Sequence, residues 1–400
     1  MGKDSEGQLE RLAAPGNGSQ ADAEARDPST APVAPGPGIH VEERRGPWGV
    51  ATRVLAFAAA LFLFVLSIQL MKRGAAAIAP RIQASGFFDN GVSTLGVGWL
   101  AAYLVLSGSP VAVMGLSLRA ADGITELQTF TMISGSRLGA SFIVLLVGFL
   151  YAIRDKNRRE ALGMGVLALS ISTLIYLPAM LLGYGILKAG FLGGVSLTAS
   201  AEVQGLIDAG WGWLVNLATT SLPNPLLFPA GLGVILVSFK LLDQVLPAID
   251  GEKHADSKGH WLKKPWPMFF LGCLAALLTL SVSVAITVLV PLAARGYVDR
   301  KEAIPYIAGA NITTLADTLL AAMLLPDGDS SVEVVLALLI AVTVVTVLLL
   351  AVAYRPLQRG IMALDEWVVG TSLRLWLFIT VLFLVPVALL VIGGVIGPVG

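Results

Sequence analysis

The sequence is poor in charge and in the residues that bind metals or form disulfides. Only 14% of its 400 residues are Asp, Glu, Lys or Arg, whereas soluble domains carry roughly 25%. The 27 basic and 27 acidic residues leave no net charge, which argues against nucleic acid as a partner. A single cysteine, Cys273, excludes an internal disulfide and a cysteine-based zinc or iron–sulfur site. The three histidines form no HExxH motif or cluster, so we expect neither a resident cofactor nor an enzyme.

What the sequence does contain is long apolar runs. Hydrophobic residues make up 56% of the chain, and many fall in blocks long enough to cross about 30 Å of hydrocarbon as a helix. We therefore predict an all-α, polytopic membrane protein. The predicted spans are 50–72, 127–153, 161–187, 226–249, 303–325, 332–354 and 373–396.

Two further apolar stretches, 92–118 and 268–295, are interrupted midway by small polar residues. The interruptions read LSGSP from Leu106 and LSVSV from Leu280. Unwound backbone at membrane depth is tolerated only where protein or water covers it. The sequence therefore predicts two broken helices or re-entrant hairpins beside a cavity.

The two interrupted stretches are copies of one another. GWLAAYLVLSGS at 98–109 aligns with GCLAALLTLSVS at 272–283, with 8 of 12 positions identical at a displacement of 174 residues. The same register continues without gaps, so that 124–139 aligns with 298–313. Upstream, 63–71 aligns with 234–242 after a three-residue offset. Each repeat is therefore a span, a hairpin and a second span.

Charges between the spans predict the orientation of the chain. Basic residues cluster at Arg154, Lys156, Arg158 and Arg159 and recur in 253–264, at Arg295, Arg300, Lys301, Arg355 and Arg359, whereas Asp327, Asp329 and Glu333 stand without basic neighbours. If the basic loops are cytoplasmic, the N-terminus is cytoplasmic, the C-terminus is exterior, and the two hairpins enter from opposite sides. The fold class is thus two inverted-topology repeats, which predicts alternating access around a midplane site.

These patterns divide the chain into five predicted regions. The first is a polar tail whose Gly-, Pro- and Ala-rich composition predicts disorder, and the short linker includes an interfacial segment at 206–222. The last region has an amphipathic, interfacial stretch at 355–369. The regions are 1–48 (tail), 49–190 (first repeat with the following span), 191–225 (exterior linker), 226–325 (second repeat) and 326–400 (two C-terminal spans).

Three elements of the sequence resemble the sodium–phosphate cotransporter family (type II). They are LFLFVLSIQLMKRG at 61–74 with its counterpart at 233–246, the serine pairs of the interruptions, and GANITT at Gly309–Thr314. The resemblance covers about residues 55–325. It implies a sodium-coupled phosphate symporter whose QSSS hairpin motifs form the ion sites.

The chain departs from the family's pattern at several of these positions. The glutamine of QSSS is Leu106 in one hairpin and Leu280 in the other, which removes two amide carbonyls that could ligate a cation. The central serines are Gly108 and Val282. Arg137 stands where the first copy of GANIGTT would have its asparagine.

Hydroxyl and amide groups form the first set of candidate site residues. Serines in membrane helices often bond to their own backbone or allow close packing, but the duplicated positions favour a binding role here. GANITT lies near the start of a predicted span, where helix N-terminal donors could face an anion or, alternatively, simply be capped. The substrate-binding candidates of this set are Ser107, Ser109, Ser281, Ser283, Ser136, Asn311, Thr313 and Thr314.

Arg137 and Asp317 are charged residues within apolar spans, where each needs a partner. We expect them to pair between the two repeats. In one hypothesis they form a structural ion pair. In the other, Arg137 binds an anionic substrate, while Asp317, with Ser107 and Ser281, carries the coupling ion.

Together these features predict a secondary active transporter in the plasma (inner) membrane. Its partners would be the lipid bilayer, a small anion such as phosphate, and sodium or a proton as coupling ion. The alternative is a non-transporting scaffold or partner subunit that kept the fold and lost the ion ligands. The oligomeric state stays open.

Overall fold

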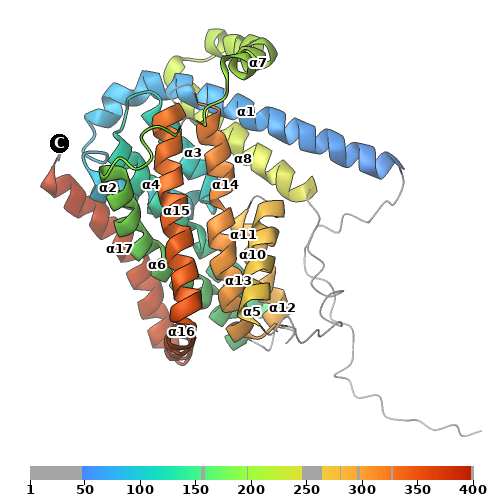
Figure 1. The fold of residues 1–400 in the computed structure, drawn as a ribbon, viewed down its shortest axis with the longest axis vertical. Coiled ribbons are helices and arrows are strands. Elements are labelled where there is room, and N and C mark those ends of the chain that lie inside the picture. Colours follow the sequence, from blue (N-terminus) through green and yellow to red (C-terminus); the bar gives the residue numbers. More distant parts are fainter. Residues whose placement is uncertain are drawn as a thin grey trace, which may run out of the picture. The chain divides into compact units, whose positions relative to one another are not determined.

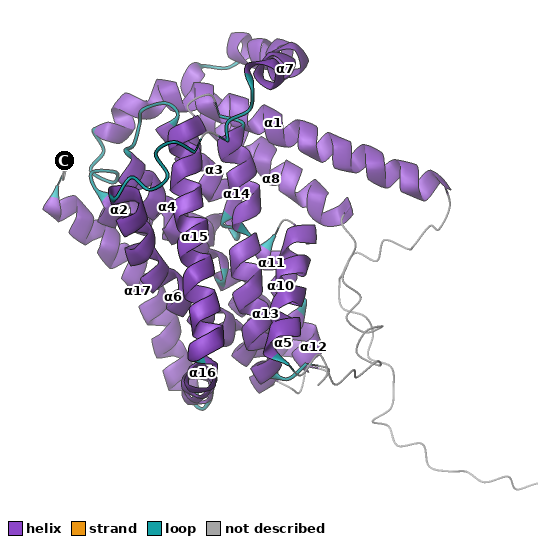
Figure 2. Cartoon of the chain, in the orientation of Figure 1, coloured by secondary structure: helices purple, strands orange, loops and turns teal. Residues whose placement is uncertain are grey.

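The computed structural model describes residues 47–154, 158–195, 197–245, 264–279, 281–294, 298–325 and 328–397. Their regular structure is helical, and these residues contain no strand (Figure 1, Figure 2). Some sequence predictions lie outside the described residues: those on the tail 1–46, Lys156, residues 253–263, Leu280, Arg295 and Asp327.

Six helices of the described residues are long and apolar enough to cross a membrane. They confirm a multi-span helical membrane protein, with the first span longer than expected. The remaining predicted span, 303–325, is divided at Thr314 into α13 (Arg300–Thr313) and α14 (Leu315–Met323). The six spans are Ala51–Gln83, Glu126–Ile153, Arg159–Lys188, Asn224–Gln244, Ser330–Val352 and Ser372–Ile396.

The spans correspond to the longest helices of the structure. The first helix, α1, begins at Pro47, within the predicted tail, since proline suits the first turn of a helix. The second span is divided at Ser141 in the way that 303–325 is divided at Thr314. The helices are α1 (Pro47–Gln83), α4 (Glu126–Ala140), α5 (Phe142–Arg154), α6 (Arg158–Lys188), α8 (Leu227–Val245) after the short 3₁₀ turn η2 (Asn224–Leu226), α15 (Gly328–Val352) and α17 (Ser372–Ile396).

Both predicted interruptions are present. Stretch 92–118 forms α2 (Gly91–Val105) and α3 (Ser109–Arg119), and stretch 268–295 forms α10 (Pro265–Thr279), α11 (Val282–Thr287) and α12 (Leu289–Ala294). Two more helices lie where interfacial segments were expected: α7 (Ala201–Ser221) and α16 (Tyr354–Val369). Whether α7 and α16 lie at the membrane surface stays a prediction.

Apolar exposure identifies the surface that contacts lipid. On α17 only 11% of the apolar window is buried, and Leu373 and Val395 are each at least 80% exposed. A soluble protein would not expose such a helix to water. The chain is therefore an integral membrane protein.

The start of the second span in each repeat is capped by corresponding residues. The side chain of Gln128 accepts a hydrogen bond from the N–H of Thr125 (2.6 Å). The side chain of Glu302 accepts one from the N–H of Asp299 (3.3 Å). Both pairs place a Gln or Glu three residues after the cap residue, as in a capping box. Glu126 and Arg300, the first residues of α4 and α13, stand 174 residues apart, as do the first residues of α2 and α10.

Glycines fix the packing within each repeat at matching positions. A Cβ at Gly98 would overlap the Met132 carbonyl oxygen, and one at Gly272 would overlap that of Tyr306. In the same way, Gly135 lies against Leu95 and Gly309 against Phe269. The backbones of α2 and α4, and those of α10 and α13, therefore touch directly.

Corresponding helices of the two halves meet in opposite directions. Along α1, Ala60 contacts Ser238 of α8 (Ser238 Oγ to the Ala60 carbonyl, 2.7 Å), whereas Gly74 contacts Phe228. Since one number rises as the other falls, α1 and α8 are antiparallel. α6 and α15 are also antiparallel, because Gly183 lies by Ala337 and Ile171 and Ile175 lie by Leu349 and Leu350.

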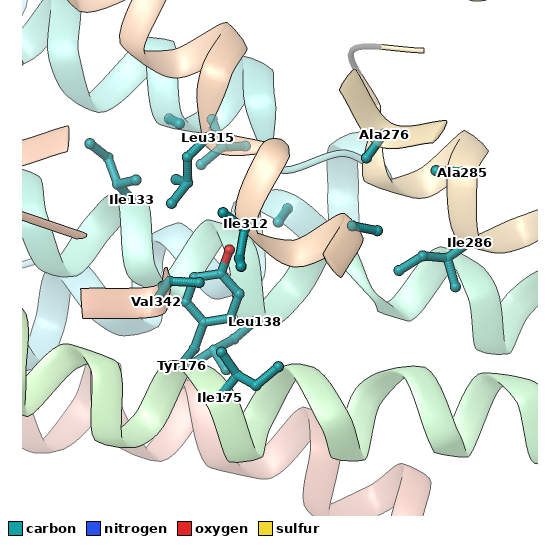
Figure 3. Close-up of a cluster of buried hydrophobic side chains, with 14 of the residues drawn as sticks. Ile133, Leu138, Ile175, Tyr176, Ala276, Ala285, Ile286, Ile312, Leu315 and Val342 are labelled. Atoms are coloured by element: carbon teal, nitrogen blue, oxygen red, sulfur yellow. The ribbon is translucent and has the colours of Figure 1, made fainter. Parts of the chain in front are cut away.

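The buried core draws on both halves of the chain. Ile133 and Leu138 of α4 lie near Ile312, Leu315 and Val342 of later helices (Figure 3). Tyr176 of α6 is fully buried, and its hydroxyl donates to the Asn311 carbonyl (2.9 Å). The core thus joins α4 and α6 to α13, α14 and α15.

Candidate functional site

The first interruption is a short, non-helical connection between α2 and α3. Leu106 ends α2 with φ 56°, in the left-handed region that a leucine rarely adopts. Gly108 precedes α3, and a Cβ there would lie 2.8 Å from the Ser136 carbonyl oxygen. The connection therefore packs tightly against α4, and this fixes the positions of Ser107 and Ser109 on either side of Gly108.

The second interruption has different local chemistry. Ser281 is extended and caps α11, because its hydroxyl accepts a hydrogen bond from the N–H of Val284 (3.3 Å). Thr279 supports the turn, since its hydroxyl donates to the Ser281 carbonyl (3.0 Å). Leu280 lies outside the described residues.

The two interruptions meet at one cavity of about 300 Å³. All four serines predicted from the duplicated motif line it, two from each interruption. Known ligand pockets begin at about this volume, so the cavity suits a small ligand. It is lined by Ser107, Ser109, Ser281 and Ser283 with Val105, Leu106, Pro110, Ile143, Val147, Leu236, Phe239, Lys240, Asp243, Val284 and Thr287.

Two residues of this cavity, Lys240 and Asp243 of α8, were not predicted from the sequence. Both are charged residues within the predicted span 226–249. That position was a usable signal, because a charge within a span marks a functional site by default. Both residues lie in 233–246, the counterpart of 61–74, but there they were used only as part of a repeat.

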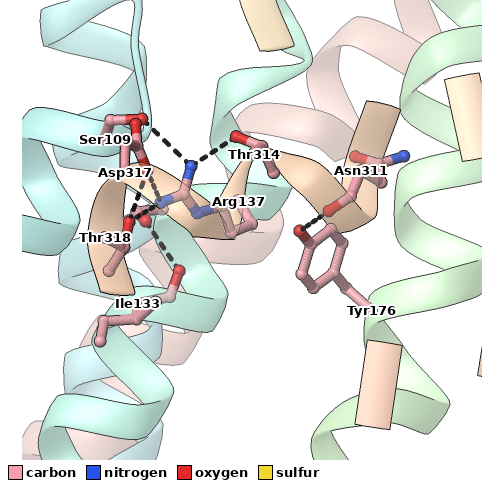
Figure 4. Close-up of polar contacts among 9 residues, drawn as sticks. Ser109, Ile133, Arg137, Tyr176, Asn311, Thr314, Asp317 and Thr318 are labelled. Carbon is pink, nitrogen blue, oxygen red and sulfur yellow. Dashed lines mark hydrogen bonds and ion pairs between the residues drawn. The ribbon is translucent and has the colours of Figure 1, made fainter. Parts of the chain in front are cut away.

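Arg137 and Asp317 form the expected ion pair, with Arg137 Nη2 3.5 Å from Asp317 Oδ1. Each residue is only 3% exposed. Arg137 Nη1 donates to the hydroxyls of Ser109 (3.2 Å) and Thr314 (2.8 Å), and Nη2 donates to the hydroxyl of Thr318. Figure 4 shows the guanidinium enclosed by these groups. One arginine therefore joins α4 to α3 and to α14.

The pair is not fully satisfied by its protein partners. Asp317 Oδ1 accepts from the Thr318 hydroxyl (2.9 Å). Among the described residues, however, Arg137 Nε and Asp317 Oδ2 are buried without a hydrogen-bond partner. Neither residue lines the cavity. Ser109 connects the two features, because it both lines the cavity and accepts from Arg137.

The remaining candidates point elsewhere. Ser136 donates to the carbonyl of Ile133 in its own helix (2.7 Å), and Thr313 donates to the Cys273 carbonyl (2.9 Å). Asn311 pairs with the Ser172 hydroxyl of α6 (3.1 Å from Nδ2). The structure thus places these three side chains in helix packing rather than at the cavity.

Two interpretations of GANITT were left open, and both place it at a helix start, which is wrong for Asn311 and Thr313. Asn311 and Thr313 lie at the C-terminal end of α13, which begins at Arg300. The N–H of Thr314 donates to the Ala310 carbonyl (3.2 Å). Asn311 is eleven residues after Arg300, so it lies about three turns into the helix and not at its start.

A second charged cluster lies at helix ends. Arg300, at the start of α13, donates to Asp365 of α16 and to Glu160 of α6 (2.9 Å). Burial raises the pKa of Asp365 to about 6, although Arg300 opposes this rise. For Arg300, burial acts to lower the pKa, but Asp365 and Glu160 raise it overall. The cluster ties the amphipathic helix α16 to both halves of the chain.

The chain was compared with known protein families, curated proteins and solved structures. The family model Na+/Pi-cotransporter matches residues 234–365, about a third of the chain. The match runs from α8 to α16 and includes the second interruption, Lys240, Asp243 and Asp317. No curated protein and no solved structure matches the chain.

The matched family implies a transporter, with sodium and phosphate as the transported ions. Residues 234–365 therefore form a Na+/Pi-cotransporter family domain within an integral, multi-span helical membrane protein.

Proposed function

We propose that the protein is a secondary active transporter that carries phosphate or another small anion by alternating access around the serine-lined cavity. The observation that carries the proposal is the meeting of two duplicated interruptions, each of which contributes two serines to one cavity. A packing role alone would not require both helix breaks to meet at a hollow.

The proposal includes two inverted repeats with re-entrant hairpins at the membrane midplane. It is supported by the antiparallel contacts of α1 with α8 and of α6 with α15, because corresponding elements of inverted repeats run in opposite directions. It is also supported by reciprocal packing, in which α3 contacts α14 and α11 contacts α5. Cytoplasmic basic loops would then place the N-terminus inside and the C-terminus outside.

In this proposal the serine hydroxyls and the freed backbone groups of the interruptions bind the substrate. A hydroxyl can donate to an anion or accept from a protonated group, and its oxygen can ligate a cation. Ser107 and Ser281 can therefore serve substrate and coupling ion in turn. The coupling ion is sodium, as the family implies, or a proton.

Arg137 and Asp317 act on the cavity through Ser109. The geometry favours the structural hypothesis for this pair, because the guanidinium is occupied by three hydroxyls and a carboxylate. Its bond to Ser109 orients one wall of the cavity. Arg137 is thus a positioning residue in this proposal.

Uptake by the purified protein in liposomes tests the proposal. We expect accumulation of inorganic phosphate under an inward sodium or proton gradient. The variant Ser107→Ala/Ser283→Ala should lose most of the uptake. The other two serines are left unchanged because they have structural roles: Ser281 caps α11, and Ser109 binds Arg137.

Ser170→Ala is the matched control, because in the described part of the chain the Ser170 hydroxyl bonds only within α6, to the Val166 carbonyl (2.7 Å). It should leave uptake unchanged. A well-folded wild-type protein without uptake under either gradient would instead favour a non-transporting scaffold, consistent with Leu106 in place of the motif glutamine.

A further inference from the structure

One face of α8 forms a wall of the cavity and carries both of the charges that line it. The lining residues of this helix are Leu236, Phe239, Lys240 and Asp243, a spacing of three, four and seven residues that places them on one helical face. A neighbouring side of α8 packs in the protein, where Ile235, Ser238 and Leu242 are buried. The charges therefore belong to the cavity side of the helix.

Lys240 and Asp243 are exposed side chains within the candidate span Asn224–Gln244. A charged side chain in a span avoids lipid and turns toward water or a polar cavity. Because the cavity lies on their face of α8, it provides the polar surroundings that these two side chains require.

The charge balance of the cavity constrains what it can bind. Among the described lining residues, Lys240 and Asp243 are the charged ones, and the rest are hydroxyl or apolar side chains. The empty cavity is therefore formally neutral. An anion that entered alone would leave a net negative charge where the dielectric constant is low, which is unfavourable. An accompanying positive charge removes this cost.

We propose that Lys240 binds the anion and that Asp243 takes up a proton as the coupling ion, so that the cavity carries anion and proton together. This inference rests on the proposed transport function and names its coupling ion. Before loading, the charges are one ammonium and one carboxylate. After loading, the anion pairs with the ammonium, and the proton converts the carboxylate to a neutral carboxylic acid. Release of both on the other side restores the starting state.

A proton suits this cavity better than a hard cation. A proton needs one basic atom, which Asp243 supplies, whereas a hard cation needs several converging oxygen ligands. Of the four lining serines, Ser109 and Ser281 already accept hydrogen bonds within the protein, which leaves fewer oxygens for a cation. Asp243 is the one carboxylate of the described lining. Leu106, which stands at a motif glutamine, brings an apolar side chain to the lining instead of an amide oxygen.

The elements around Asp243 supply few competing charges. The cavity residues of α3, α5 and α11 include no titratable group among those described. The basic residues of α1 are Arg53, Lys72, Arg73 and Arg81, and that of α3 is Arg119. Since α1 and α8 are antiparallel, Arg53 is the one nearest along α1 to the Asp243 end of α8. No ion pair between Arg53 and Asp243 is present in the described part of the chain.

Phosphate uptake into liposomes that contain the full-length protein tests this inference. In sodium-free buffer with an acidic exterior, we expect the wild type to accumulate phosphate. Asp243→Asn should reduce this accumulation at least about tenfold. It should retain exchange of phosphate at equal pH, because exchange needs no net proton movement. Lys240→Gln should raise KM at least about tenfold.

Exposed residues outside the cavity supply matched controls. Asp208→Asn on α7 and Lys188→Gln at the end of α6 should leave both activities unchanged, because Asp208 and Lys188 are exposed and do not line the cavity. Phosphate titrates in this pH range, but its protonation is the same for every variant. The difference between the wild type and Asp243→Asn therefore reports on Asp243.

The outcomes separate the two proposals. If uptake depends on sodium alone and is unchanged in Asp243→Asn, this inference is wrong, but the proposed transport function is kept. No uptake by the folded wild type under either gradient overturns the transport function and this inference with it. If Asp243→Asn fails to fold, the wild type alone decides. A pH gradient without sodium must then drive accumulation of phosphate. If only a sodium gradient drives it, the inference is wrong.

Discussion

The two ion-pair clusters of this protein use the same chemistry in different surroundings. Arg137 and Asp317 are sealed in the core, with side chains 2% and 3% exposed. Arg300, at 17%, lies between the fully buried Asp365 and the 40%-exposed Glu160. In the inner cluster, Arg137 contacts three hydroxyls and one carboxylate, whereas in the outer cluster Arg300 contacts two carboxylates.

The difference shows how burial sets the role of an ion pair. In the inner cluster, removal of either partner leaves a charge that has no access to water, so the two residues depend on one another. In the outer cluster, Glu160 can be solvated and Asp365 can take up a proton near pH 6. The inner pair is therefore a fixed structural link, and the outer cluster responds to its solvent.

The largest expected effect is at the inner pair. Arg137→Gln should destabilise the folded protein by about 3–5 kcal/mol, because it leaves Asp317 charged and unpaired. The measurement is the yield of monodisperse protein and its thermal stability in detergent, with uptake recorded separately. Arg137→Gln/Asp317→Asn should recover part of the loss, since both charges are gone.

Arg53→Gln serves as the control, because Arg53 is exposed. A stable Arg137→Gln protein that has lost uptake would reverse our assignment and make Arg137 a substrate-binding residue.

The outer cluster should give an intermediate, pH-dependent effect. Burial raises the pKa of Asp365 from 3.8 to about 6. Between these two pH values the folded state therefore holds a proton that the unfolded state has released. Stability should then be greatest below about pH 4 and fall as the pH rises to about 6, by up to about 3 kcal/mol. Thermal unfolding of wild type and Asp365→Asn between pH 4 and 7 measures this, and the variant should show the flatter profile. Equal slopes in the two proteins would contradict it.

The smallest effect is expected at the exposed end of the outer cluster. Glu160→Gln should cost no more than about 0.5–1 kcal/mol, because the carboxylate is partly solvated and exposed pairs contribute little. Raised salt should shrink the difference further. A loss as large as that of Arg137→Gln would show that the two clusters do not differ as proposed.

Much of the fold could be predicted from the sequence because its signals are local or repeated. Apolar length predicted six of the spans, and the duplicated motif predicted both interruptions. The division of 303–325 was missed because Thr314 marks it with no Gly or Pro. The start of α1 within the predicted tail was missed because the composition around Pro47 is that of a loop.

The site was predicted less completely, since its residues come together only through packing. The four serines were found because duplication marked them, and Arg137 and Asp317 were found because charge is rare in spans. Lys240 and Asp243 were missed because they belong to α8, away from either interruption. Asn311 and Thr313 were assigned to the site by motif, but tertiary contacts with Ser172 and Cys273 engage their side chains.

The glycine contacts have a mechanical consequence. With no side chain between their backbones, α2 and α4 cannot slide past one another without collision, and the same holds for α10 and α13. Each pair of helices therefore forms one rigid unit. The alternating access proposed above would then have to occur at contacts outside these two pairs, such as those of α3 with α14 and of α5 with α11. An engineered crosslink within a pair should leave uptake unchanged, and one between α3 and α14 or between α5 and α11 should block it.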